Sequence, residues 1–269
     1  MGAAFVYAAH PLGKMLTPTI QRFDSIDSTN LEAMRQAKAG ANEGVCIIAR
    51  EQTQGRGRLD RSWHSPKDAG LYFSMVLRPA FEIGRWPLIN LAAALACSEA
   101  LAKVCQLTVN IKWPNDICVA DRKLGGILAE AIETAAGAAV VLGMGINLNS
   151  QSLPPHLNDI ATSIESVSSL PIDRESLTAE LIRATTRRYE MLRTENGAEG
   201  TIRDWCANSS YAYDRAVRVT LHDESFEGVT RGLESDGALR VATSDGGMKI
   251  VRAGDVSALR AVSFRDSDQ

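Results

Sequence analysis

The sequence predicts an α+β protein in which a mixed central β-sheet carries helices on one face and a small β-barrel follows at the carboxyl end. Between residues 109 and 147, short apolar segments follow one another through tight turns, which favours this class over a doubly wound fold. A long apolar stripe at 86–104 predicts a core helix. After residue 213 the chain changes to short alternating segments separated by Asp-Gly and Gly-Gly turns, a pattern typical of a small barrel.

These patterns divide the chain into three parts. Residues 1–18 are expected to form a flexible N-terminal extension, residues 19–213 the main domain, and residues 214–269 the barrel domain. The main boundary is placed at 212–215, where the pattern changes.

The amino-terminal part of the main domain is expected to supply three strands and a helix. Ile20–Phe23 reads as a short strand, and the helix after it would begin with a capping box formed by Thr29 and Glu32. Val45–Ala49 and Gly70–Leu77 are apolar runs of strand length, so the segment between them would be a loop at the rim of the sheet.

Three further helices are expected. In Trp86–Val104 leucines recur among alanines, and Pro87 suits a first helical turn. After a surface connection at 151–172, Asp173 can cap a long helix, and a shorter helix surrounds Ile202–Cys206. The remaining strands are expected at Val109–Trp113, Ile117–Ala120, Gly126–Ile132, Val140–Asn147, Val217–Leu221, Ser225–Gly232, Ala238–Ala242 and Met248–Val251.

The composition is that of an ordinary globular protein, with 269 residues, 45% of them hydrophobic, and a formal net charge of −3. A mildly acidic chain does not favour general binding to nucleic acid or to an anionic membrane. Five cysteines without C-x-x-C spacing indicate reduced core thiols rather than a zinc cluster or a disulfide framework. No apolar run is expected to reach the roughly 18 residues of a membrane span, and no signal peptide is recognised, so we expect a cytoplasmic protein.

The stretch Gln52–Trp63, QTQGRGRLDRSW, is the strongest candidate for a functional loop and is called the Arg loop below. Arg56, Arg58 and Arg61 are interleaved with glycines that let the backbone come close to a ligand. Each guanidinium fits carboxylate or phosphate oxygens, and three so close together repel one another unless an anion lies between them. The stretch therefore predicts a site for a polyanionic ligand, although an exposed basic turn explains it equally well when it is considered alone.

Three more stretches combine charged or amide side chains with glycine or proline. They are Lys112–Asp116 (KWPND), Lys123–Gly126 (KLGG) and Gly143–Asn149 (GMGINLN). The last of them is similar to the start of a dinucleotide-binding loop. It lacks the third glycine, and two prolines at 154 and 155 prevent the helix that should follow, so this function is excluded.

Taken in order, EQTQGRGRLDRSWHSP, IKWPNDI, RKLGGILAE and GMGINLN resemble the signature series of biotin–protein ligases. The resemblance runs from Asp27 to Asn149, and four motifs in one order are far more specific than any single one. It implies a main domain similar to class II aminoacyl-tRNA synthetases and a Src-homology-3-like barrel. It also implies the catalytic-only type, since about 20 residues before the first strand are too few for the DNA-binding domain of the regulatory type.

The activity that this resemblance implies uses biotin as substrate, with ATP and Mg²⁺. Biotin would be activated to biotinyl-5'-AMP and then transferred to a lysine of a biotin carboxyl carrier protein domain, either of acetyl-CoA carboxylase or of another biotin-dependent carboxylase. Attack of a carboxylate on a phosphate brings like charges together, so positive charge must be supplied at that point.

The resemblance also implies roles for individual residues. Those expected to be catalytic are Lys123, Arg58 and Asp116. Those expected to bind biotin are Ser28, Thr29, Gln52, Gly55, Arg56, Arg58, Lys123 and Gly126. Those expected to bind ATP are Arg58, Arg61, Trp63, Asn115, Asp116, Lys123 and Asn147. Two roles stay open for Asp116, which would either hold Mg²⁺ or orient the incoming lysine. Trp113 is expected to be a packing residue.

One position departs from the family pattern, because Asp60 stands where family loops usually carry glycine. Its carboxylate could neutralise part of the charge of the Arg cluster, or it could tether Arg58 or Arg61 in the empty state. We hypothesise that Asp60 modulates retention of the adenylate. A loop so poor in apolar residues is also expected to be mobile without ligand and to close over the adenylate, which protects the mixed anhydride from water.

The sequence leaves two alternatives to a biotin–protein ligase. A lipoate–protein ligase or octanoyltransferase is expected to share this fold, but it gives no reason for GRGR followed by KWPND. A nucleic-acid-binding module would use the Arg loop and the barrel, yet the acidic composition argues against it. Neither DNA nor membrane is expected as a partner. Monomer and homodimer both stay open, since Val140–Leu148 could be an edge strand that pairs with another copy.

Overall fold

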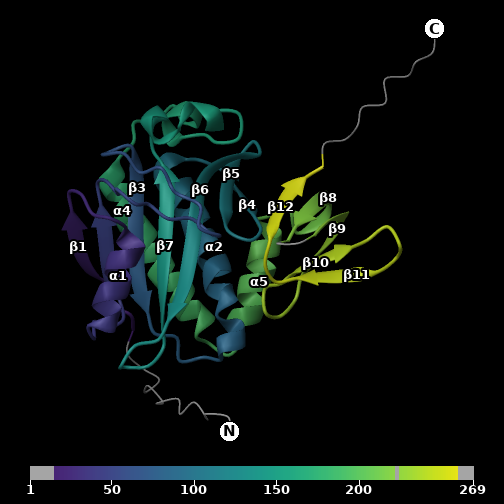
Figure 1. The fold of residues 1–269 in the computed structure, drawn as a ribbon, viewed down its shortest axis with the longest axis horizontal. Coiled ribbons are helices and arrows are strands. Elements are labelled where there is room, and N and C mark those ends of the chain that lie inside the picture. Colours follow the sequence, from purple (N-terminus) through teal and green to yellow (C-terminus); the bar gives the residue numbers. More distant parts are fainter. Residues whose placement is uncertain (1–14, 222–223, 260–269) are drawn as a thin grey trace.

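The computed structural model describes residues 15–221 and 224–259, which form two sheets and the helices around them (Figure 1). The larger sheet has seven strands in the order β1-β2-β3-β7-β6-β5-β4, and only its β1–β2 pair is parallel. The smaller sheet is antiparallel, in the order β11-β10-β9-β8-β12. The predicted α+β class with a mixed sheet and a carboxyl-terminal β-domain is confirmed.

Most elements lie close to the ranges that the sequence predicts. The strands of the larger sheet are β1 (Thr19–Phe23), β2 (Val45–Ala49), β3 (Gly70–Leu77), β4 (Asn110–Lys112), β5 (Asp116–Val119), β6 (Arg122–Ile132) and β7 (Ala139–Asn147). Those of the smaller sheet are β8 (Tyr213–Thr220), β9 (Ser225–Leu233), β10 (Leu239–Ala242), β11 (Met248–Val251) and β12 (Asp255–Ala258), the last of which was not predicted. The α-helices are α1 (Thr29–Lys38), α2 (Pro87–Cys105), α3 (Ile164–Val167), α4 (Arg174–Leu192) and α5 (Gly197–Ala207).

The three long helices α2, α4 and α5 gather on one face of the larger sheet, as predicted, whereas α1 covers the opposite face (Figure 1). On that face Ala33 and Ala37 of α1 pack against Ile47, Val76 and Val141. The small alanine side chains let the helix lie close to the sheet. The amino terminus of α1 is thereby placed at the edge of a surface that the other helices leave open.

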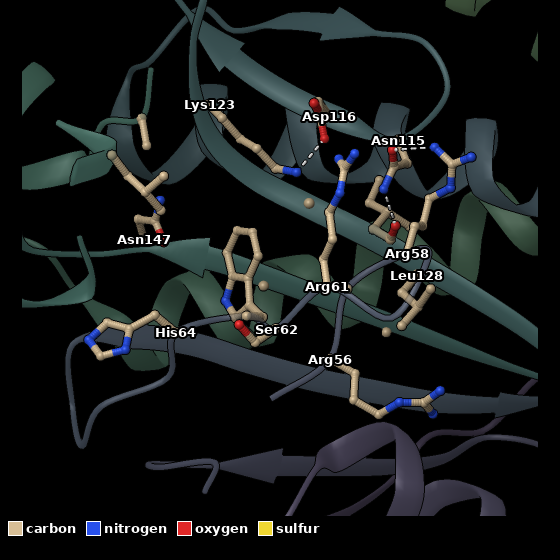
Figure 2. A pocket seen from close by; sticks show the side chains of 18 of the residues that line it. Arg56, Arg58, Arg61, Ser62, His64, Asn115, Asp116, Lys123, Leu128 and Asn147 are labelled. Atoms are coloured by element: carbon tan, nitrogen blue, oxygen red, sulfur yellow. Dashed lines mark hydrogen bonds and ion pairs between the residues drawn. The ribbon is translucent and has the colours of Figure 1, made fainter. Parts of the chain in front are cut away.

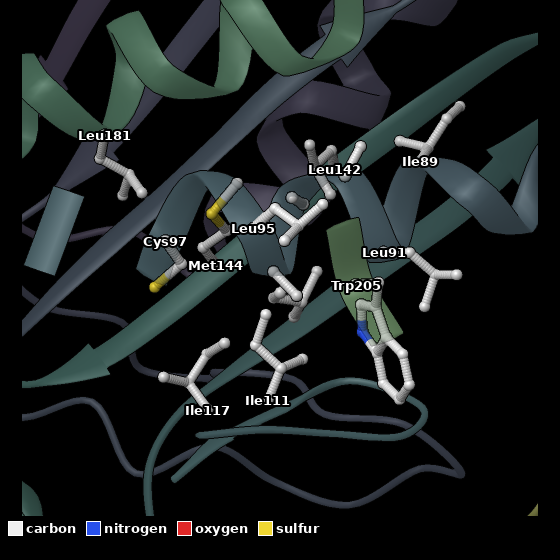
Figure 3. Packing of buried hydrophobic residues seen from close by; sticks show 14 of the residues in the cluster. Ile89, Leu91, Leu95, Cys97, Ile111, Ile117, Leu142, Met144, Leu181 and Trp205 are labelled. Carbon is white, nitrogen blue, oxygen red and sulfur yellow. The ribbon is translucent and has the colours of Figure 1, made fainter. Parts of the chain in front are cut away.

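Helix α2 is the centre of the hydrophobic core (Figure 3). The range Ile83–Cys105 has the length and the mean hydropathy, 1.6, of a membrane span, so the expectation that the chain contains no such run is wrong. Most of that range is nevertheless buried inside the protein, against the sheet and against α4 and α5. A helix that is apolar all round is typical of such a buried position.

The two predicted helix caps differ in outcome. The cap at Asp173 is confirmed, because its Oδ1 accepts the backbone N–H of Ser176 at 3.0 Å. The capping box of Thr29 and Glu32 is wrong, since no side-chain cap is formed there. The backbone N–H and the hydroxyl of Thr29 both donate to Oε1 of Gln52 instead, at 2.8 and 3.1 Å. The start of α1 is therefore tied to the Arg loop.

Two expectations about the ends of the main domain also need revision. Strand β7 lies between β3 and β6, so the possibility of an edge strand at Val140–Leu148 is wrong. Of the extension expected at 1–18, residues 1–14 lie outside the described part of the chain. Leu16, inside that extension, is buried, and its backbone N–H donates to Oε1 of Glu190 at 2.7 Å.

The two sheets share one hydrophobic core. Val241 of the smaller sheet belongs to the same buried cluster as the residues of α2. Trp113 is buried, and its Nε1 donates to the carbonyl oxygen of Gly237 at 3.1 Å, which agrees with a packing role for this residue. The C-terminal sheet is thereby held against the domain that carries the Arg loop.

Candidate active site

A cavity of about 770 Å³ opens on the α1 side of the larger sheet, where the Arg loop crosses β6 and β7 (Figure 2). It is lined by the start of α1, the loop, residues 112–116, the two strands, residues 152–161 and the last strand of the smaller sheet. The site is thus assembled from segments that are far apart in the sequence.

Three glycines of β6 and β7, Gly126, Gly143 and Gly145, leave room in the floor of the cavity for side chains from other elements. A Cβ on Gly145 would lie 2.6 Å from the indole of Trp63, and one on Gly126 would lie 3.3 Å from the same ring. A Cβ on Gly143 would overlap Oδ1 of Asn30. The GMG and GG motifs therefore let Trp63 and Asn30 lie directly on the sheet.

A β-bulge turns the lysine of the KLGG motif toward the cavity. Gly125 pairs with Ile117, but the next pair is Lys123 with Cys118, so Leu124 is the extra residue. Strict alternation would have placed Lys123 and Gly125 on one face of the sheet. The bulge instead brings Lys123 to the cavity side, beside Gly126.

The Arg loop is internally ordered. The N–H of Trp63 donates to the carbonyl oxygen of Gly55 at 2.9 Å, and the N–H of Gly57 donates to that of Arg61 at 2.7 Å. Gly55 does not line the cavity itself but lies behind Trp63, where a side chain would collide with the Trp63 carbonyl. The loop is thus better ordered than its composition suggests, while its mobility stays a prediction.

Arg58 and Arg61 point toward the C-terminal sheet. Arg61 forms an ion pair with Asp255 at 2.5 Å, and Arg58 lies 3.8 Å from the same carboxylate. The Arg58 guanidinium also donates to the carbonyl oxygen of Gly254 at 3.3 Å and to Oδ1 of Asn115 at 3.2 Å. Burial lowers the pKa of Arg58 from its ordinary value, and the nearby Asp255 opposes that shift.

Asp60 does not tether the arginines. It forms no ion pair with any residue in the described part of the chain, and it is exposed at the loop tip with a φ of 57°. Glycine adopts this left-handed conformation more readily than other residues, which is a conformational reason for glycine at this position in related loops. The tether that we expected from Asp60 is supplied by Asp255, which the sequence did not indicate.

Lys123 and Asp116 form a close charged pair in the cavity. Lys123 Nζ lies 2.5 Å from Asp116 Oδ1 (Figure 2). Lys112 Nζ lies 3.8 Å from Asp116 Oδ2, and the Lys123 ammonium lies 5.5 Å from the centroid of the Trp63 ring. Two ammonium groups thus compete for the carboxylate that was considered as a metal ligand. Among the described residues, no group of three metal-ligating side chains is found.

The far end of the cavity is a compact polar pocket. Ser28 and Thr29 are almost completely buried at the start of α1. Gln52 accepts hydrogen bonds from Thr29 and donates to the Ser65 hydroxyl at 2.9 Å. The Ser74 hydroxyl lies 2.7 Å from that of Thr29. These groups can recognise a small neutral head rich in hydrogen-bonding atoms.

The other wall is mostly apolar and comes from the surface connection that the sequence left without a role. Leu153, Pro154, Leu157 and Ile160 line the cavity there. Asn147, at the end of β7, donates to a backbone carbonyl of this connection, that of Thr162, at 3.0 Å. An apolar wall of this kind suits the face of a purine or an alkyl chain.

Comparison with known proteins shows the family to which this chain belongs. Residues 21–147 match the biotin/lipoate A/B protein ligase family, and residues 214–259 match the biotin protein ligase C-terminal domain. The chain is 33% identical over 239 residues to the biotin–[acetyl-CoA-carboxylase] ligase of Mycobacterium tuberculosis, with 87% of this chain and 86% of that one covered. The chain belongs to the biotin–protein ligases. It is also 34% identical over 235 residues to the bifunctional ligase/repressor BirA of Bacillus spizizenii, with 86% of this chain and 71% of that one covered.

The fold is that of a solved biotin–protein ligase. A structure from Aquifex aeolicus, in complex with biotin and ATP, superposes with a TM-score of 0.76 at 27% identity and covers 90% of this chain and 99% of that one. The sequence motifs predicted most of the residues that line this cavity. All the site residues expected from the motifs line it except Gly55.

Several residues at this ligase site were not expected. They are Asn30, Leu128, Glu130, Gly143, Gly145 and Asp255. The two glycines lie in a motif that was noted, so their role could have been inferred from it. Glu130 and Asp255 are single acids on strands, and only their position in the fold connects them with the Arg loop.

Proposed function

We propose that this chain is a biotin–protein ligase, which activates biotin with ATP to biotinyl-5'-AMP and then transfers biotin to a lysine of a biotin carboxyl carrier protein. The observation that carries the proposal is the convergence of Arg58, Arg61 and Lys123 on a cavity whose far end is polar and uncharged. Such a cavity suits an acid with a neutral head. Membership of the family makes biotin that acid.

In this proposal the ureido head of biotin lies against Ser28, Thr29 and Gln52. The alkyl chain runs along the cavity, and the carboxylate reaches Lys123 and Arg58. A carboxylate oxygen attacks the α-phosphorus of ATP, and the bond to pyrophosphate breaks. The positive charge of Arg58, Arg61 and Lys123 offsets the approach of two anions and is already in place before the reaction.

Magnesium is the metal that ATP chemistry implies here, and it would supply further positive charge to the phosphates. Two carboxylates line the cavity, but Asp255 is paired with Arg61, so the described residues fit the ion mainly through Asp116. Most of its ligands would be phosphate and water oxygens, since no group of three metal-ligating side chains is found among the described residues. We propose that Asp116 acts mainly by holding Lys123 in position. Lys112, on the other side of Asp116, contributes to the same cluster.

In the second step the amine of a carrier lysine attacks the carbonyl carbon of the adenylate, and AMP leaves. The partner is a biotin carboxyl carrier protein domain of acetyl-CoA carboxylase or of another biotin-dependent carboxylase. We also propose that the enzyme works in the cytoplasm. Its cysteines agree with a reducing compartment, since four of the five are buried as free thiols.

The test compares acids in ATP–pyrophosphate exchange and then measures the mass of a carrier domain. Exchange is expected with biotin and not with lipoate, followed by the mass gain of one biotin on the carrier. Lys123→Gln is expected to lower adenylate formation by about 100-fold, as the loss of one preorganised charge at a reacting oxyanion does. The control Lys67→Gln changes an exposed lysine outside the cavity. ATP–pyrophosphate exchange with lipoate but not with biotin would overturn the proposal, and so would a carrier whose mass does not change.

A further inference from the structure

We propose that Glu130 is a positioning residue, which holds the Arg loop over the cavity through Arg56 and so limits escape of the acyl-adenylate. The kinetic part of this inference rests on the proposed function, whereas its structural part does not. The motifs suggested that Arg56 wraps the ligand. The structure also gives it a partner on the sheet.

The pair is a two-point contact. Arg56 NH2 lies 3.1 Å from Glu130 Oε1, and NH1 donates to Oε2 at 3.3 Å. In Figure 2 the Arg56 side chain extends away from Arg61 and Lys123, whose ends lie on the other side of the loop. Arg56 is thus engaged with β6 and is not directed at the place where the phosphates would react.

The side chain of Glu130 is itself held in position by a buried residue, Asn30. Nδ2 of Asn30 donates to Glu130 Oε2 at 2.8 Å and to the carbonyl oxygen of Leu128 at 3.3 Å. Oδ1 of Asn30 accepts from the hydroxyl of Ser74 at 2.6 Å. Asn30 and Ser74 are buried, with 4% and 0% of their surfaces exposed. Because the Glu130 carboxylate is already held by Asn30, little further side-chain entropy is lost when it pairs with Arg56.

The loop is therefore anchored on both sides. Arg56 binds Glu130 of the main domain, while Arg61 binds Asp255 of the C-terminal sheet. A phosphate that draws Arg58 and Arg61 toward itself would compete with the Asp255 contact, but it would leave the Glu130 anchor intact. The Glu130 contact can thus keep the loop closed during the time that the adenylate waits for the carrier.

The experiment is a double-mutant cycle with Glu130→Gln, Arg56→Gln and the double variant. The first readout is limited trypsin digestion of the ligand-free protein, scored by mass at the bonds after Arg58 and Arg61. Glu130→Gln is expected to be cut about fivefold faster than the wild type, the factor that an exposed ion pair at the upper end of its range would give. Because both residues act through one contact, the double variant is expected to be cut no faster than either single variant.

The second readout is the rate at which labelled biotinyl-5'-AMP escapes into solution. It is expected to rise for Glu130→Gln and for Arg56→Gln, while the KM for biotin changes little in Glu130→Gln. Arg56→Lys, which keeps the charge but not the two-point contact, is expected to fall between the wild type and Arg56→Gln. Glu133→Gln is the matched control, because this exposed acid lies just beyond the end of the same strand. Melting temperatures verify that each variant is folded.

Cleavage of Glu130→Gln at the wild-type rate would overturn the inference. Additive effects of the two substitutions on digestion would overturn it too, since the two side chains would then act on the loop independently of their contact. If the wild type forms no adenylate, the proposed function fails. The digestion result still decides whether Glu130 anchors the loop.

Discussion

At the residue scale, the shape of the cavity depends on glycines in its floor, which carry no Cβ. Gly126, Gly143 and Gly145 lie on adjacent strands, and each leaves room for a side chain that comes from another element. The sequence motifs showed the glycines but not what would lie on them. That information needs the register of β6 against β7, in which Gly126 pairs with Gly145.

Gly143→Ala is expected to destabilise the protein by about 1–3 kcal/mol, the usual cost of overpacking a buried site. The added methyl would overlap Oδ1 of Asn30, which cannot move away without losing its hydrogen bonds to Ser74 and Glu130. Urea denaturation measures the loss. Gly84→Ala is the control, because a Cβ there meets no atom within 4 Å. Equal unfolding midpoints for the two variants would show that the floor is not tightly packed.

Most single functional residues were predictable because they stand in short motifs. Arg58, Lys123 and Asp116 were found in this way. Glu130 and Asp255 were not, since the sequence offers many single acids and only tertiary structure selects these two. Asp60 shows the same limit, because it stands next to Arg61 in the sequence yet forms no ion pair with a described residue.

At the element scale, periodicity located nearly every strand and helix, but it did not fix their details. The β-bulge at Leu124 breaks strict alternation in β6, and the side chain of Lys123 faces the cavity only because of it. A capping box was expected at α1, yet Thr29 bonds to Gln52 of the loop. In both cases a tertiary contact decides the local structure, and no window of the sequence contains it.

The contact between α4 and α2 gives a prediction on pH. Glu180 of α4 accepts hydrogen bonds from Arg183 and from Lys103 of α2, and these lower its pKa to about 2. A carboxyl whose pKa falls on folding stabilises the protein above its ordinary pKa of 4.5 and loses that contribution as the pH falls toward about 2. Glu180→Gln is therefore expected to unfold more easily at pH 6, by only roughly 1 kcal/mol, because Lys103 and Arg183 are more than half exposed to solvent although Glu180 itself is buried.

Urea unfolding at a series of pH values checks this expectation. The difference between Glu180→Gln and the wild type should shrink as the pH falls from 4.5 toward 2. Glu175→Gln, on the same helix, is the control, since Glu175 and its partner Arg22 are both well exposed. A difference that is independent of pH would mean that the Glu180 charge contributes nothing and that only its packing matters.

At the scale of the whole molecule, the division into parts at 19–213 and 214–269 describes the sequence pattern and remains a proposal for the domains. The two sheets meet through a continuous core, in which Leu91 of α2 contacts the β9–β10 turn at Gly237. The Arg loop spans the same junction through Asp255. Composition could not reveal this, because each part on its own has a pattern typical of an independent domain.

A shared core predicts that the two parts unfold together. Leu91 is buried, so Leu91→Ala should remove about 2–5 kcal/mol of stability by leaving a cavity at the junction. If the sheets form one cooperative unit, hydrogen exchange of the β3 and β8 amides will speed up by the same factor in this variant. Met191→Ala serves as the control, since that side chain is half exposed at the end of α4. Faster exchange in β8 alone would mean that the C-terminal sheet opens independently. Asp255 of that sheet lines the proposed adenylate site, so the site would then be complete only while the C-terminal sheet is packed against the main domain.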